Sequence, residues 1–435
     1  MLTKLDLGRI AKSLRSKGYD RFEIFAEISH RTLVKHQDRN DSVQLCRSGG
    51  ISVQGSLNGS THYFNTSDFS TAGVLKSIAG EKPGPLSAPV KPHYETRHPQ
   101  KFVQLTEFYR SLSSASHEVS PLLTYEEEFR EFEVLSSDDD QPSRGEDEKV
   151  HLNLQWYSPK ERKLFRIPWH RRSVEGLLSD LSGEPALRQT FYHYLAPPVR
   201  WPLPSGEVDT VWSSLAFSKL LLPLIRLCEA DQNFGNDNFW EKTGPLPDWF
   251  SLSDSPEENA RCDFQGVARK PTPLVEKGKL ARFACNRGLA GELNCLPTGH
   301  GRRESFTSPV GVGLWNAKVD GPRTDHSLVE ALGNGIFVGD IELLGWQPSR
   351  ALCRVLLREG RLVHHGELGE YLEPLAIDIA LPRLLHSCAA LGPIAQSRGF
   401  RISKPQGRHI TEVSTPDALT AALPYPGQVP PSHYW

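Results

Sequence analysis

The feature that most constrains the fold is an alternation of apolar and polar residues over positions 22–67. Phe22 and Ile24 share one face of this segment, with polar Glu23 between them, and a period of two residues is typical of β-strands. Hairpin signals follow at Ser48-Gly49-Gly50 and Asn58-Gly59. The segment therefore predicts an antiparallel sheet with one buried face.

On either side of these predicted strands, the apolar residues recur at the spacing of a helix. Leu5, Leu7, Ile10 and Leu14 predict an amphipathic helix that ends near Gly18, and residues 68–78 predict another. We also expect a helix that enters a strand over Glu126–Leu135.

The chain is long enough, at 435 residues, for two domains. Four prolines without periodicity in 196–206 mark the boundary, and short strands separated by Gly, Pro and Asn follow it. We predict an α+β fold in three parts. These are an N-terminal domain of helices on an antiparallel sheet (1–205), a β-rich, barrel-like or sandwich-like domain (206–415) and a Pro-rich tail (416–435).

Composition excludes several classes of protein. The formal net charge of −2 gives no basic surface for nucleic acid, and no stretch approaches the roughly 20 apolar residues of a membrane helix. The seven cysteines are scattered without a CxxC pair. This is typical of reduced thiols, so we expect a cytoplasmic protein.

Several short motifs of the second half occur in a fixed order, and each contains a glycine. They are Asp263–Val267, Leu274–Leu280, Pro297–His300, Gly333–Val338 and Leu357–Gly360. Their order resembles the TldD/PmbA (TldD/TldE) metalloprotease family, whose C-terminal domain has a similar run, and the strands and glycines of the N-terminal half agree with it.

The resemblance implies an HExxxH zinc helix after the domain boundary, because two imidazoles on one helix face can share a zinc ion and the Glu can activate its water. With Glu229-Ala230-Asp231 as the anchor, Leu221, Leu222 and Arg226 stand at the positions of the His, the Glu and the second His. Leu and Arg offer no lone pair to a metal. Pro223 is expected to kink or end this helix. We therefore expect neither catalytic nor metal-binding nor cofactor-binding residues in this chain.

Two other clusters carry candidate residues. In His364-His365-Gly366-Glu367, His365 and Glu367 would share one face of a strand and could supply metal ligands, although a polar hairpin tip is the simpler interpretation. The loop that carries His300, Arg302 and Arg303 could line a cleft, where Arg302 or Arg303 could meet a peptide carboxylate, although a basic surface turn is the simpler interpretation.

The resemblance implies a TldE-like, non-catalytic subunit that forms a heterodimer with a TldD-like subunit. The partner would carry the zinc, and the complex would degrade or mature unfolded or ribosomally made peptides, bound by strand addition. Two alternatives stay open: a stand-alone peptide-binding or assembly protein, or an atypical metallopeptidase that uses His364, His365 and Glu367.

Overall fold

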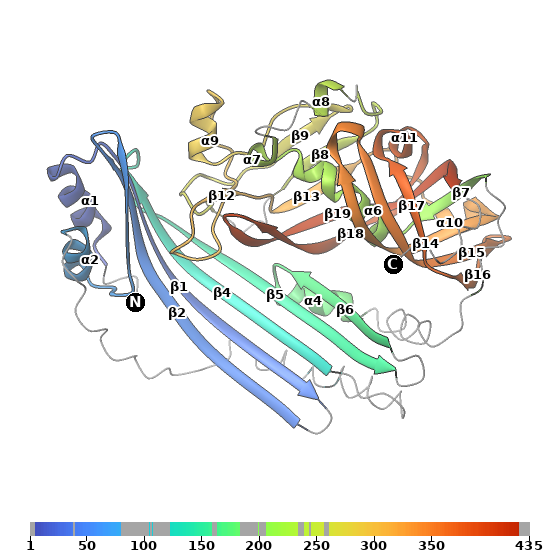
Figure 1. Ribbon diagram of the computed structural model, residues 1–435, viewed down its shortest axis with the longest axis horizontal. Coiled ribbons are helices and arrows are strands. Elements are labelled where there is room, and N and C mark those ends of the chain that lie inside the picture. The colour runs from blue at the N-terminus through green and yellow to red at the C-terminus, as the bar shows by residue number, and fades with distance from the viewer. Residues whose placement is uncertain are drawn as a thin grey trace.

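A computed structural model gives the fold of the chain (Figure 1). Apart from three isolated positions, the residues that it describes are 5–37, 40–79, 122–158, 163–182, 206–233, 239–242, 245–255 and 261–425.

The N-terminal half forms a six-stranded sheet, in which every neighbouring pair of strands is antiparallel and the order is β3-β2-β1-β4-β5-β6. Helices α1 (Leu7–Ser16) and α2 (Thr71–Ile78) pack at one end of this sheet (Figure 1). Ile10 and Leu14 of α1 are buried in one core with Ile24 of β1. The strands are β1 (Arg21–Gln37), β2 (Asn40–Leu57), β3 (Ser60–Thr66), β4 (Leu122–Ser136), β5 (Ser143–Ser158) and β6 (Lys163–Arg171).

Two local predictions in this half were wrong. Glu126–Leu135 is strand throughout, as part of β4, because alternate residues from Leu123 to Phe129 are buried. Gly49 and Gly50 form no hairpin but lie inside β2. A Cβ atom on Gly50 would lie 2.3 Å from the ring of Phe306, so this glycine serves close packing.

The Asn58-Gly59 hairpin signal is confirmed, because these residues connect β2 to β3. Both have positive φ, 52° and 77°, as a two-residue turn between twisted strands requires. Gly18 also has the positive φ, 87°, that favours glycine just after α1.

The C-terminal half is a large mixed sheet. The main strand order is β10-β9-β8-β13-β19-β7-β14-β15-β16, with β17 paired to β15 and β18 paired to β19. Two of its contacts, β13–β19 and β14–β7, are parallel. Its strands are β7 (Gly206–Trp212), β8 (Ser251–Asp254), β9 (Thr272–Glu276), β10 (Lys279–Leu280), β13 (Asn316–Asp320), β14 (Gly335–Gln347), β15 (Leu352–His364), β16 (Glu367–Leu372), β17 (Leu375–Ala380), β18 (Cys388–Lys404) and β19 (Gly407–Tyr425).

The α+β class and the β-rich C-terminal half are confirmed. Among the described strands the sheet is not a closed barrel, because its order begins at β10 and ends at β16 without pairing between them. Helices lie against it, with a small β11–β12 hairpin, whereas α4 (Val174–Ser182) packs on β5 and β6 of the first sheet. They are α6 (Ser214–Arg226), α7 (Ala230–Asn233), α8 (Phe239–Lys242), α9 (Arg287–Glu292), α10 (Leu328–Leu332) and α11 (Leu381–His386), while β11 is Gly301–Arg302, β12 is Gly311–Val312 and η2 is Pro348–Arg350.

The predicted Pro-rich tail is shorter than expected. β19 continues through Pro416, which pairs with Ala395 of β18, and ends at Tyr425. Pro416 sits where the β18–β19 register shifts, a position at which the missing N–H of proline is tolerated. Residues 426–435, with Tyr434 and Trp435, lie outside the described part of the chain.

The two sheets meet where β6 runs beside β18 and where the loops after β11 reach β1 and β2 (Figure 1). At the first contact, a Cβ atom on Gly399 would lie 1.7 Å from the backbone oxygen of His170, so only glycine fits. A shared aromatic cluster joins the halves further along, with Phe25 and Phe132 from strands of the first sheet and Phe264 and Trp315 from loops of the C-terminal half.

Candidate functional site

Helix α6 carries the three positions that we predict to align with the zinc motif. Ser213 caps it by accepting a hydrogen bond from the backbone N–H of Ala216. The helix continues past Pro223 to Arg226, so the proline does not end it. It packs on β19 and β14 of the large sheet.

The structure places none of these three side chains where it could bind a metal. Leu221 is fully buried in the main core, and Leu222 packs against the same core from a partly buried position. The Arg226 guanidinium donates a hydrogen bond of 2.8 Å from Nη2 to Gln232 Oε1. Leucine has no donor atom for a metal and arginine is always protonated, so these residues do not fit a zinc ion.

A buried cation lies immediately beyond α6 instead. Lys404 Nζ, at the end of β18, lies 2.8 Å from Glu229 Oε2 and 2.8 Å from Asp231 Oδ1, and it donates to the Val312 carbonyl at 2.6 Å. The side chains of Lys404 and Glu229 are each 2% exposed. Burial raises the pKa of Glu229, against the lowering effect of Lys404.

His409 of β19 completes this cluster. Its Nε2 lies 3.9 Å from Glu229 Oε1, and burial together with Arg302 and Lys404 lowers the pKa of His409 well below its ordinary value. The ring is therefore neutral at physiological pH. The sequence did not reveal Lys404 or His409 as part of this region, because both lie more than 170 residues after Glu229 and carry no motif of their own.

A stack of arginines surrounds Trp315 near the cluster. The guanidinium carbons of Arg269, Arg302 and Arg172 lie 3.2, 3.8 and 4.5 Å from the centroid of the indole. Such contacts place the cations against the negative face of the ring.

The buried carboxylate of Asp147 compensates part of this charge. Asp147 Oδ1 lies 3.0 Å from Arg172 Nη2 and 4.0 Å from Arg302 Nη1. Burial alone would raise the pKa of Asp147, but Arg302 and Arg172 hold it below its ordinary value. Burial lowers the pKa of Arg302 to about 9, although Asp147 opposes the shift. Arg302 is thus part of an internal charge network.

His300 is also internal, with 1% of its surface exposed. Its Nε2 lies 3.1 Å from Asp254 Oδ2, and its Nδ1 lies 2.8 Å from Thr298 Oγ1. Asp254 Oδ1 in turn accepts the backbone N–H groups of Trp315 and Asn316. The histidine therefore ties the loop before β11 to the sheet.

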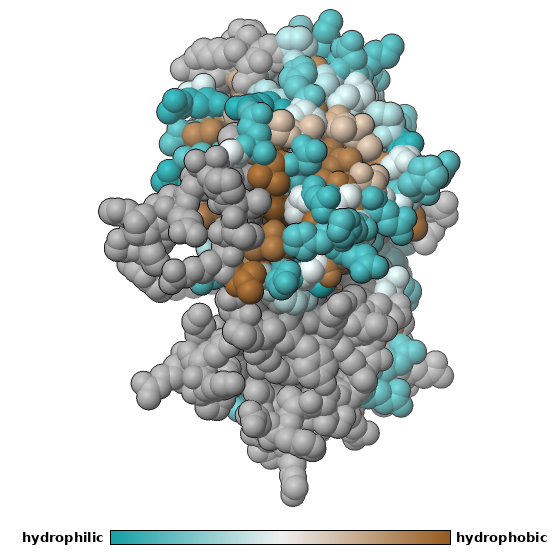
Figure 2. Space-filling view, turned by 90° about the vertical axis from the view of Figure 1, so that its right-hand side faces the viewer, coloured by the Kyte–Doolittle hydropathy of each residue, from teal (hydrophilic) through white to brown (hydrophobic). Residues whose placement is uncertain are grey.

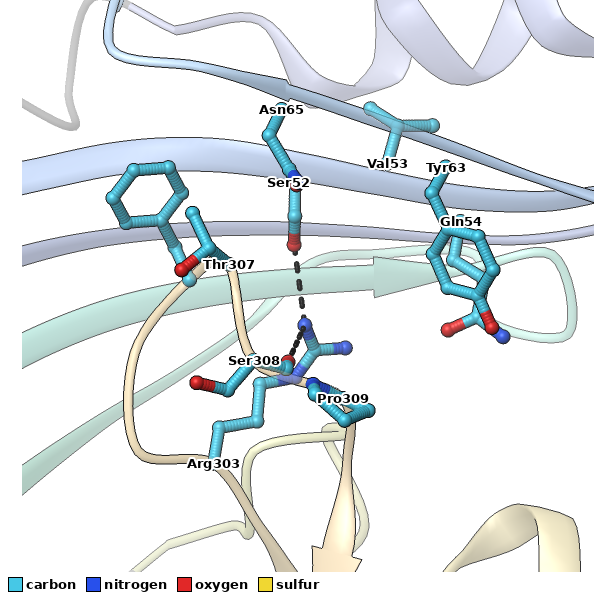
Figure 3. A pocket seen from close by; sticks show the side chains of 10 residues that line it. Ser52, Val53, Gln54, Tyr63, Asn65, Arg303, Thr307, Ser308 and Pro309 are labelled. Carbon is cyan, nitrogen blue, oxygen red and sulfur yellow. Dashed lines mark hydrogen bonds between the residues drawn. The ribbon is translucent and has the colours of Figure 1, made fainter. Parts of the chain in front are cut away.

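Arg303 does line a pocket, of about 300 Å³, between β2, β3 and the loop after β11. Figure 3 shows its guanidinium pointing toward Ser52, to which Nη1 donates at 3.1 Å. Arg303 also pairs with Glu23 and lies over the Phe25 ring. The lining residues are Ser52, Val53, Gln54, Tyr63, Asn65, Arg303, Phe306, Thr307, Ser308 and Pro309.

The HHGE cluster is the tip of the β15–β16 hairpin. His364 pairs with Glu367 across the hairpin, and His365 and Gly366 form the turn with φ of 53° and 79°. Within the described residues, no group of three or more His, Cys, Asp or Glu side chains is placed to hold a metal ion.

The C-terminal half matches a known protein family. Residues 205–422 match the model of the PmbA/TldA metallopeptidase C-terminal domain, which covers half of the chain. The chain belongs to this metallopeptidase family.

One curated protein is similar to part of this sequence, and several solved structures have a similar fold. The chain is 28% identical over 114 residues to the metalloprotease MJ0996 of Methanocaldococcus jannaschii, an alignment that spans only 25% of that protein. The fold is similar to that of TldE from Thermococcus kodakarensis (TM-score 0.71, 16% identity, 96% of this chain and 98% of that chain). It is also similar to a putative modulator of a DNA gyrase from Thermotoga maritima (TM-score 0.70, 16% identity, 96% and 98%).

Proposed function

We propose that this chain is a catalytically silent, TldE-like subunit of a heteromeric zinc metalloprotease. A TldD-like partner would carry the HExxxH helix and the zinc ion, and the complex would act on peptides in the cytoplasm. Of the helices in the described residues, none is long and apolar enough to cross a membrane.

The observation that carries this proposal is the side-chain content of α6. At the aligned positions, Leu221 belongs to the hydrophobic core and Arg226 is hydrogen-bonded to Gln232. A working zinc site needs three or four lone-pair donors that converge on one point. The buried ammonium of Lys404 beside Glu229 adds a positive charge that repels a divalent cation.

Surface features support a partner and an extended peptide. Figure 2 shows a face on which several hydrophobic side chains gather next to hydrophilic ones, a distribution typical of protein contacts. Among the described strands, β3 ends the order of the first sheet, and its Tyr63 and Asn65 line the pocket beside Arg303. An edge strand next to polar side chains is suited to peptide binding by strand addition.

The direct test measures peptidase activity of the purified chain, alone and after co-expression with a TldD-type chain from the same organism. We expect no cleavage of an unstructured peptide by the chain alone and chelator-sensitive cleavage by the complex. A partner whose HExxxH glutamate is changed to Gln is the matched control, and it should assemble without activity. Chelator-sensitive activity of the chain alone would overturn the proposal.

The same preparations distinguish the alternatives. A self-sufficient homomer that binds peptide and ignores the TldD-type chain would favour a stand-alone binding protein. Stoichiometric metal in the isolated chain, lost in His365→Ala, would favour an atypical site at the β15–β16 tip.

A further inference from the structure

Two cysteines flank the short helix α9 and meet at its base. Cys285 directly precedes the N-cap residue Asn286, and Cys295 follows the C-cap residue Leu293 by two positions. Their Sγ atoms lie 3.8 Å apart. This contact brings together two of the seven thiols that the sequence scatters without a CxxC motif.

The capping of α9 fixes this approach. Asn286 Oδ1 accepts the backbone N–H of Leu289 at the start of the helix. At the end, Asn294 adopts a φ of 52° and the N–H of Cys295 donates to the Ala290 carbonyl at 2.9 Å. This hydrogen bond and that from Asn294 N–H to the Gly291 carbonyl are those of a Schellman motif, which turns the chain back toward the helix. Local backbone geometry thus returns Cys295 to Cys285.

The two thiols differ in their surroundings. Cys285 is buried, and its backbone N–H donates to Thr298 Oγ1 at 2.8 Å, so it is anchored to the segment that precedes β11. Cys295 is exposed and belongs to an exposed stretch, residues 291–296, in which Leu296 is 85% exposed. Cys295 is therefore the thiol that a small reagent reaches first.

We propose that Cys285 and Cys295 form a redox-modifiable dithiol that closes into an intrachain disulfide across α9. A low-molecular-weight disulfide such as oxidised glutathione is the oxidant. The Cys295 thiolate attacks one of its sulfurs, which forms a mixed disulfide and releases one thiol. The Cys285 thiolate then attacks Cys295 Sγ, which forms the intrachain bond and releases the second thiol.

The bond would change the surface that α9 presents. It would join the anchored residue Cys285 to the exposed side of the loop and hold the segment that carries Leu293 and Leu296. This effect does not depend on the proposed proteolytic complex. Burial raises the pKa of Cys285 to about 11, with a smaller contribution from Cys295, so closure should accelerate about tenfold per pH unit from pH 7 to pH 9.

The test treats the reduced full chain with oxidised glutathione and maps its cysteines by mass spectrometry of non-reduced peptides. We expect a Cys285–Cys295 cross-link with the loss of two thiols and no glutathione retained on either residue. Cys46, which is exposed, should carry a stable glutathione adduct and serves as the internal control for the reagent.

Two variants make the result decisive. In Cys285→Ser, no second thiol can displace glutathione, so Cys295 should retain the adduct. In Cys295→Ser, Cys285 should stay reduced while Cys46 still reacts. A persistent glutathione adduct on Cys295 of the wild-type chain, or an unreacted Cys295 beside a modified Cys46, would overturn the proposal.

Discussion

Lys404 Nζ lies 2.8 Å from Glu229 Oε2 in a place where both side chains are almost fully buried. Glu229 belongs to the segment that follows α6, whereas Lys404 ends β18. The pair therefore connects the segment just after α6 to the end of β18, which comes much later in the sequence. A buried pair of this kind is sensitive to the loss of one partner, because the other charge is left without compensation.

Lys404→Met should lower the free energy of unfolding by about 3–5 kcal/mol at pH 7, since it leaves the Glu229 carboxylate buried beside Asp231. Denaturant unfolding of the variant measures this loss. The double variant Lys404→Met/Glu229→Gln should recover part of it, and equal losses in the single and double variants would contradict a charge-based cause.

Leu221→His should lower the free energy of unfolding by about 3 kcal/mol or more without binding zinc, because the imidazole enters a packed apolar core with no second ligand. Leu222→His is the matched control at a partly buried position and should be milder. Unfolding curves with and without zinc measure both effects. A zinc-dependent stabilisation of Leu221→His would show that α6 still borders a metal site.

Glu359→Gln should stabilise the chain above pH 7. Burial, and then Asp340, raises the pKa of Glu359 to about 7, while Arg361 and Lys219 act in the opposite direction. Because the folded state binds this proton more tightly, the contribution of Glu359 to stability is full below about pH 4.5 and is lost as pH rises through 7.

The glutamine stays neutral at every pH, so the gain at pH 8 should be about 2 kcal/mol, after allowance for the partial exposure of Glu359. It should vanish near pH 4. Unfolding measured across this range gives the difference, and a gain that does not vary with pH would argue against titration of Glu359.

Gly399→Ala should separate β18 from β6, because the added methyl would lie 1.7 Å from the His170 carbonyl oxygen. We expect a loss of about 3 kcal/mol or more in the free energy of unfolding. Gly291→Ala is the matched control. Nothing lies within 4 Å of its Cβ position in α9, so it should be neutral or stabilising by up to about 1 kcal/mol. Equal effects of the two changes would contradict the steric argument.

Local pattern predicted several elements of the N-terminal half correctly. The alternation after Phe22 predicted the strands of the first sheet, and Asn58-Gly59 predicted a real hairpin, because side-chain period and positive φ are local properties. The same reasoning failed at Gly49-Gly50 and at Glu126–Leu135. There the deciding facts are the Phe306 ring packed on Gly50 and the buried alternate residues of β4, which lie opposite distant segments.

In the candidate site, too, the sequence predicted the placement of some residues and not of others. Of the residues expected to line a cleft, Arg303 lines the pocket beside β2 and β3, while His300 and Arg302 are held inside by Asp254 and by the Trp315 stack. Sequence spacing gives the order of such residues along a loop. It does not give the side of the loop on which each packs.

By itself the sequence determined the α+β class, which follows from short-range periodicity, and carried the motifs that resemble the metallopeptidase family. The alignment of Leu221, Leu222 and Arg226 with the zinc ligands is what that resemblance implies and stays a prediction. Only the tertiary structure decided that Lys404 lies against Glu229, that three arginines stack on Trp315 and that Cys285 meets Cys295. The first joins segments more than a hundred residues apart, and the second gathers residues from both halves of the chain around one indole, so no local pattern carries them. The third depends on how the turns of α9 close.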